Sequence, residues 1–97
     1  MNGSLEFIQE WYASNCDGDW EHSYGIKIET LDNPGWMVIV DLEETESEDL
    51  RVTEKVEHSD IDWFNINVKE KQLVACGDSK KLIFLLDRIK DILSQKS

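Results

Sequence analysis

The sequence predicts an α+β fold, in which an antiparallel four- or five-stranded meander sheet carries an N-terminal and a C-terminal helix on its apolar face. Two patterns predict it. Apolar residues recur at three- and four-residue spacing near both ends, as in amphipathic helices, and alternate with polar residues between them, as in half-buried strands. The connections between the expected strands are short, which favours antiparallel neighbours.

The N-terminal helix is expected over residues 4–15, with Ser4 as its N-cap. The last helix is expected over residues 80–94, with Ser79 as its N-cap. Both would turn an apolar face to the sheet. For the last helix, this face comprises Leu82, Leu85, Leu86, Ile89, Ile92 and Leu93.

Strands are expected between the two helices. The first follows Gly25, and the second, over residues 36–42, is apolar on both faces except at Asp41, which favours an interior place in the sheet. A turn at residues 32–35 separates them, because proline presets one backbone dihedral angle and glycine accepts a positive one. The later strands are expected over residues 50–56, 62–68 and 72–76. A chain of 97 residues has room for one core, so we expect a single domain over residues 1–97.

Acidic residues dominate the charge of the chain. It has 21 acids and 10 bases, and 15 of the acids but only three bases lie in residues 17–62. Nucleic acid and anionic membrane each need a basic face, so we expect neither as a partner. A basic protein is the natural complement, and long-range attraction would speed its capture by roughly 10- to 1000-fold at low salt. The alternative is that the charge only maintains solubility.

The sequence also predicts a soluble, cytoplasmic protein. Cys16 and Cys76 make no disulfide framework, and the first residues lack the basic region and unbroken apolar stretch of a secretory signal. The longest apolar runs are far shorter than the ~20 residues that span a bilayer.

Residues 16–22 read CDGDWEH and raise the hypothesis of a metal site. The acids are spaced like the opening of a calcium loop, but the required glycine is replaced by His22 and the required final carboxylate by Ile28. A zinc site would lack any close pair of ligands, because its candidates are Cys16, His22, His58 and Cys76. We therefore expect neither a metal nor another cofactor.

The same stretch raises two catalytic hypotheses. A reactive thiolate needs a helix N-terminus or neighbouring cations, whereas Cys16 follows the end of an expected helix and precedes three acids. Glu21 and His22 would not form an acid–base pair, because neighbours in an extended segment point to opposite faces. There is also no glycine-rich phosphate loop and no Gly-x-Ser-x-Gly elbow. We expect no enzyme, and a small enzyme that uses Cys16 is the alternative.

Residues 11–36, WYASNCDGDWEHSYGIKIETLDNPGW, closely resemble the signature of the immunity protein 53 family of bacterial polymorphic toxin systems. The shared elements are W-Y, C-D-G-D-W-E-H and G-I-x-I-x-T-L-D-N-P-G-W, with weaker similarity through Asp62-Trp63 and Gly77-Asp78. The resemblance implies a non-catalytic protein that binds and neutralises a cognate toxin domain. Such toxins are often nucleases with basic clefts, which an acidic protein would complement. Some members carry a rhodanese-like label, and the acids after Cys16 argue against that chemistry.

We expect the toxin to contact the acidic stretch at residues 43–49 and the loop around Trp20. Tryptophan is enriched at binding hot spots, and Trp20, in a loop, and Trp63, opposite Phe64, are better candidates than Trp11 and Trp36, whose spacing indicates core. The predicted contact residues are Trp20, Glu21, Glu43, Glu44, Glu46, Glu48, Asp49 and Trp63. An acidic adaptor for a basic host protein is a second alternative.

Overall fold

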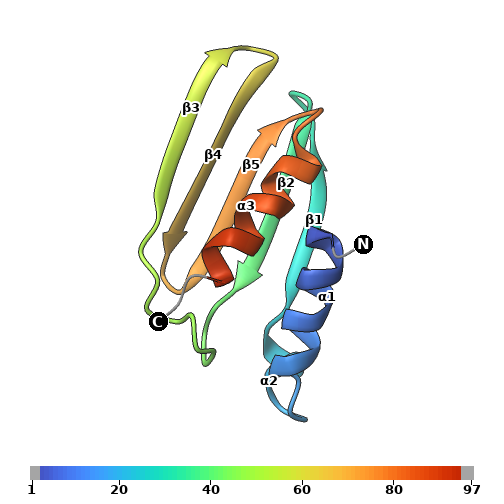
Figure 1. Cartoon of the computed structure of the whole chain (residues 1–97), viewed down its shortest axis with the longest axis vertical. Helices are drawn as coiled ribbons and strands as arrows, with labels where there is room; N and C mark the ends of the chain where they lie inside the picture. Colours follow the sequence, from blue (N-terminus) through green and yellow to red (C-terminus); the bar gives the residue numbers. More distant parts are fainter. Residues whose placement is uncertain (1–2, 95–97) are drawn as a thin grey trace.

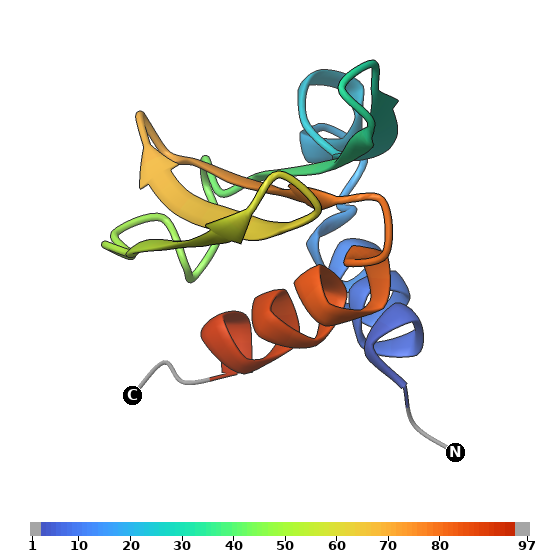
Figure 2. The same cartoon turned by 90° about the horizontal axis from the view of Figure 1, so that it is seen from above.

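A computed structural model describes residues 3–94, which form a five-stranded sheet with two helices on one face (Figures 1 and 2). A third, single-turn helix precedes the first strand. In chain order, the elements are α1 (Ser4–Asn15), α2 (Trp20–Ser23), β1 (Ile26–Leu31), β2 (Gly35–Asp41), β3 (Thr53–Ser59), β4 (Asp62–Lys69), β5 (Gln72–Asp78) and α3 (Leu82–Ser94). The expected α+β class, with a helix from each end of the chain, is confirmed.

The strand order is β1-β2-β5-β4-β3, and every pair of neighbours is antiparallel. Strands β3, β4 and β5 form a sequential meander. The β1–β2 hairpin joins it through β2, which pairs with β5, so the chain crosses from β2 to the far edge at β3 through residues 42–52. This is the longest connection between strands, and it lies at the opposite end of the sheet from the β3–β4 turn (Figure 1).

The core lies between the sheet and α3. This helix packs on β5 and β2, whereas α1 packs mainly beside α3. Fully buried strand residues from β2, β4 and β5 meet the predicted apolar face of α3, and each buried valine, leucine or isoleucine side chain contributes about 1.5–3 kcal/mol by leaving water. The central members of this core are Val38, Val40, Ile66, Leu73, Ala75, Leu85, Leu86 and Ile89.

Two glycines allow close approaches, Gly35 between β2 and β5, and Gly77 between β5 and the chain that leads into α3. A Cβ atom on Gly35 would lie 2.4 Å from the carbonyl oxygen of Gly77, and one on Gly77 would lie 2.9 Å from the Cβ of Lys81. Residues 32–34 form the expected turn, but Gly35 does not have the positive φ that was predicted for it. Gly35 is required by the close contact between β2 and β5 instead.

Both predicted N-caps are wrong. Ser4 is the first residue of α1 and Gly3 occupies the cap position. At the other end, α3 begins at Leu82 rather than directly after Ser79. The chain first makes a turn in which a carboxylate oxygen of Asp78 accepts the backbone N–H of Lys80 at 2.9 Å.

The third strand is displaced along the chain. Expected over residues 50–56, it occupies Thr53–Ser59 and includes part of the break predicted at residues 58–60. Leu50 and Val52 precede the strand but pack against the core. Their alternation therefore reflects burial, and the carbonyl oxygen of Val52 still accepts the backbone N–H of Val68 in β4 at 3.0 Å.

Candidate functional site

Residues 16–22 form a shaped turn that leads into α2. Asp17 accepts the backbone N–H groups of Asp19 and Trp20 at 2.9 and 3.0 Å, and Glu21 accepts those of Asp17 and Gly18 at 3.0 and 2.9 Å. The N–H groups of Trp20 and Asp19 hold the pKa of Asp17 below its ordinary value, because they favour the ionised carboxylate. Gly18 has a φ of 97°, which suits glycine. The carboxylates of Asp17 and Glu21 therefore organise the backbone.

Trp20 belongs to the interior of the protein. The residue is only 3% exposed, and its indole N–H donates to the carbonyl oxygen of Glu43 at 2.8 Å. The rings of Trp11, Tyr12 and Tyr24 surround it at centroid distances of 6.0, 5.9 and 6.1 Å. Because Trp20 offers a partner almost no surface, its predicted role as a direct contact must be corrected. It supports the start of the acidic stretch.

The acidic stretch, hereafter the acidic segment (residues 43–49), has a defined shape. The N–H and the hydroxyl of Thr45 both donate to the carbonyl oxygen of Leu42, at 3.1 and 2.8 Å. The same hydroxyl accepts the N–H of the buried Ser47 at 3.1 Å. One carboxylate oxygen of Glu48 accepts the N–H of Glu44 at 2.9 Å. These bonds fix consecutive turns, and Glu44, Glu46 and Asp49 remain exposed.

One lysine lies beside the acidic segment. Nζ of Lys71, in the β4–β5 turn, is 3.4 Å from Glu48 and 3.9 Å from Glu43. The pKa of Glu48 is lowered, first by the N–H of Glu44 and then by Lys71. The pKa of Lys71 is raised, first by its hydrogen bond to Glu48 and then by the charge of Glu43. Glu43 and Glu48 are thus partly neutralised by Lys71.

The other predicted contact residues do not all gather here. The hydrogen bond between Trp20 and Glu43 places α2 next to the acidic segment, but the carboxylate of Glu21 already holds the preceding loop. Trp63 is half-buried near the start of β4, at the end of the sheet that carries the β3–β4 turn. The acidic segment lies at the opposite end (Figure 1). One compact contact surface does not include both Trp63 and the acidic segment.

The cysteines lie in different parts of the structure. The thiol of Cys16 donates to the carbonyl oxygen of Tyr12 at 3.3 Å, at the end of α1. Cys76 is half-buried in β5, and burial raises the pKa of its thiol. Within residues 3–94, no three or more histidine, cysteine, aspartate or glutamate side chains are grouped to hold a metal ion. No helix in this range is long and apolar enough to cross a membrane.

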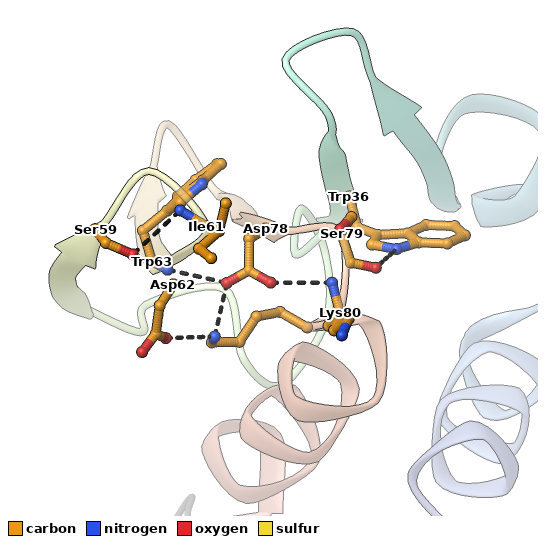
Figure 3. Close-up of polar contacts among 9 residues, drawn as sticks. Trp36, Ser59, Ile61, Asp62, Trp63, Asp78, Ser79 and Lys80 are labelled. Atoms are coloured by element: carbon orange, nitrogen blue, oxygen red, sulfur yellow. Dashed lines mark hydrogen bonds and ion pairs between the residues drawn. The ribbon is translucent and has the colours of Figure 1, made fainter.

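A buried polar network at the start of α3 was not identified from the sequence (Figure 3). Asp78 is 3% exposed and accepts the N–H groups of Trp63 and Lys80, each at 2.9 Å, and Nζ of Lys81 at 2.7 Å. Lys81 also donates to Asp62 at 2.8 Å. Burial acts to raise the pKa of Asp78, but these three donors outweigh it and hold the pKa at about 2. The network joins β4, β5 and the turn that leads into α3.

The fold and these surfaces define a small α+β protein whose acidic segment is held in a fixed shape by internal hydrogen bonds. The family model of immunity protein 53 matches residues 5–94, and the chain belongs to this family. The resemblance seen in residues 11–36 is therefore confirmed. Membership in a family of immunity proteins implies a cognate toxin as the binding partner. Comparisons with curated proteins and with solved structures found no match.

Proposed function

We propose that this protein protects bacterial cells by binding a cognate toxin domain in the cytoplasm, without catalysis, and that the acidic segment is its contact surface. Family membership supports the immunity role. The observation that carries the choice of surface is the fixed conformation of the acidic segment, which presents Glu44, Glu46 and Asp49 to solvent.

The conformation matters because binding costs conformational entropy when a loop must become ordered. Internal hydrogen bonds of Thr45 and Glu48 already fix the segment, and the burial of Trp20 fixes its start through Glu43. Little further ordering of this backbone is needed when a partner arrives. More of the electrostatic attraction is then retained as binding free energy.

The charge determines the kind of partner. Five of the seven residues of the acidic segment are acids, and Lys71 contacts two of them, Glu43 and Glu48. A toxin with a basic surface, such as a nuclease with a basic cleft, complements such a segment. Complementary charges act mainly on the association rate, and salt weakens this effect.

The first test is co-expression with the toxin domain encoded next to this protein, followed by purification. We expect growth to be rescued and a 1:1 complex to be recovered. If neither is observed, the immunity proposal for that toxin is wrong, and the acidic-adaptor alternative should be tested with basic host proteins.

The second test compares two triple variants in association kinetics over a range of salt concentrations. Glu44→Gln, Glu46→Gln and Asp49→Asn together should slow association and flatten its salt dependence. The matched control removes three exposed acids on α1 and α3, by Glu6→Gln, Glu10→Gln and Asp87→Asn. Both variants change the net charge equally, so equal kinetics for the two would reject the acidic segment as the contact surface.

A further inference from the structure

We propose that the outer edge of β1 is an interface between two copies of this chain. The two β1 strands would pair antiparallel about a two-fold axis that passes through the sheet at Ile28. The two five-stranded sheets would then form one continuous sheet, with α1 and α3 of both copies on the same face. This proposal concerns the isolated chain and does not depend on the proposed function.

The two edges of the sheet differ in how they are protected. β1 and β3 are the outer strands. β3 contains a register shift between Glu57 and Ser59, and Glu54 on this strand pairs with Arg88 of α3. Irregular pairing of this kind discourages the addition of another strand. β1 pairs regularly with β2 along all six residues and has no such shift.

The β1 edge is also open. Residues 27–30 of this strand are all exposed, and an outer strand leaves alternate backbone N–H and C=O groups without a strand partner. α1 lies on the face of the sheet that carries α3, hereafter the helix face, and packs mainly beside α3 (Figure 2). It therefore leaves residues 27–30 uncovered. A second strand can therefore approach β1 from outside.

An apolar surface lies beside this edge. Ile28 is 41% exposed, and Leu5 and Tyr12 of α1 are 62% and 38% exposed. Leu5 and Tyr12 line a depression that reaches Ile26 at the start of β1. In the described residues, three of the six exposed large apolar side chains thus lie on α1 or β1. Such a concentration of apolar side chains is typical of an interaction surface.

The charge pattern of β1 identifies a second copy as the occupant. With the axis at Ile28, Lys27 of each copy lies opposite Glu29 of the other, and Ile28 lies opposite Ile28 on the helix face. Moving the axis to Lys27 or to Glu29 places like charges directly opposite, which is unfavourable. An isologous interface requires this kind of self-complementarity. The acids elsewhere in the two copies repel, but physiological salt screens charges beyond about 8 Å.

Sedimentation equilibrium of the purified full chain, without toxin and at physiological salt, tests the proposal. We expect a dimer of the 11.3 kDa chain. Lys27→Glu and Glu29→Lys should each weaken dimerisation about tenfold, because each reversal changes two cross-strand pairs. The double variant should restore it. Lys55→Glu, an exposed reversal on β3, is the matched control and should have no effect, and circular dichroism should confirm that every variant is folded.

A chain that is monomeric at all concentrations would overturn the proposal, and so would a dimer that the double variant fails to restore. If the chain is monomeric and the β1 variants weaken toxin binding instead, the edge is a toxin contact and not a dimer interface. A monomeric result would reject only the dimer proposal and not the immunity role, because the experiment contains no toxin.

Discussion

The indole N–H of Trp20 donates to the carbonyl oxygen of Glu43 at 2.8 Å, across 23 positions of the sequence. This bond links the two stretches that are most prominent in the sequence, the CDGDWEH block and the acidic segment. The CDGDWEH block therefore has a supporting role, because the ring of Trp20 is buried and Asp17 and Glu21 accept hydrogen bonds from the backbone around it. The family signature therefore includes residues that build the fold next to the acidic segment.

Replacing Trp20 separates the contribution of this bond from that of ring burial. Trp20→Phe keeps an aromatic ring but leaves the carbonyl of Glu43 without its donor, so we expect a loss of about 1–3 kcal/mol in the free energy of unfolding. Trp20→Ala should cost about 3–5 kcal/mol, because it also leaves a cavity. Urea unfolding measures both. If Trp20→Phe has wild-type stability, the hydrogen bond does not support the acidic segment.

Asp78 should be important for stability although it has no proposed contact with the toxin. Asp78→Asn removes the negative charge and replaces one of the two accepting oxygens by an NH₂ group, so either the bonds from Trp63 and Lys81 or the bond from Lys80 are lost. We expect a loss of about 1.5–3 kcal/mol at neutral pH, measured by urea unfolding. The matched control is Asp87→Asn, an exposed aspartate on α3. Equal stabilities of these two variants would contradict the role of the network.

The same carboxylate predicts a pH dependence. The pKa of Asp78 is lowered from 3.8 to about 2 on folding. As the pH falls, this carboxylate is therefore protonated at a higher pH in the unfolded chain than in the folded one. The stabilisation from Asp78 is therefore complete above about pH 4 and is lost as the pH falls through about 2. Unfolding free energies measured over this range should fall less steeply for Asp78→Asn than for the wild type. Parallel curves would show that the network does not govern acid unfolding.

Gly35 should not tolerate even the smallest side chain. The Cβ atom of Gly35→Ala would lie 2.4 Å from the backbone oxygen of Gly77, and relief of this clash must separate β2 from β5. We expect a loss of about 3 kcal/mol in thermal or urea unfolding. Gly25→Ala is the control, because its Cβ would make only an ordinary 3.9 Å contact with Tyr12. A neutral Gly35→Ala would contradict the close packing of these strands.

Cys16→Ser tests the alternative of a cysteine-dependent enzyme. The thiol donates to the carbonyl of Tyr12, and a hydroxyl is able to donate to the same oxygen. If the protein acts by binding, as we propose, this variant should rescue toxin-expressing cells as well as the wild type does. A folded variant that binds the toxin but fails to protect would instead support chemistry at Cys16.

The sequence by itself determined the types of element and the family. The helical spacing of Leu85, Leu86 and Ile89 and the alternation around Ile26 and Ile28 report local periods of 3.6 and 2 residues, which depend on backbone geometry and burial. The confirmed resemblance depended on one long block of residues 11–36. Boundaries and caps were less accurate, because Ser4 and Ser79 have the chemistry of caps but their positions depend on where packing begins each helix.

Only the tertiary structure decided the strand order and the roles of individual polar and aromatic residues. The pairing of β2 with β5 joins segments distant in sequence, and no local period encodes such a choice. No local pattern reveals the burial of Trp20 either. The sequence places it in a loop and so predicts an exposed side chain, whereas three other aromatic rings and the carbonyl of Glu43 enclose it in the structure. Asp78 looks like an ordinary residue before a helix, and its importance arises because β4 and α3 bring Trp63 and Lys81 to it. Burial and hydrogen bonding depend on neighbours in space, which a linear sequence does not specify.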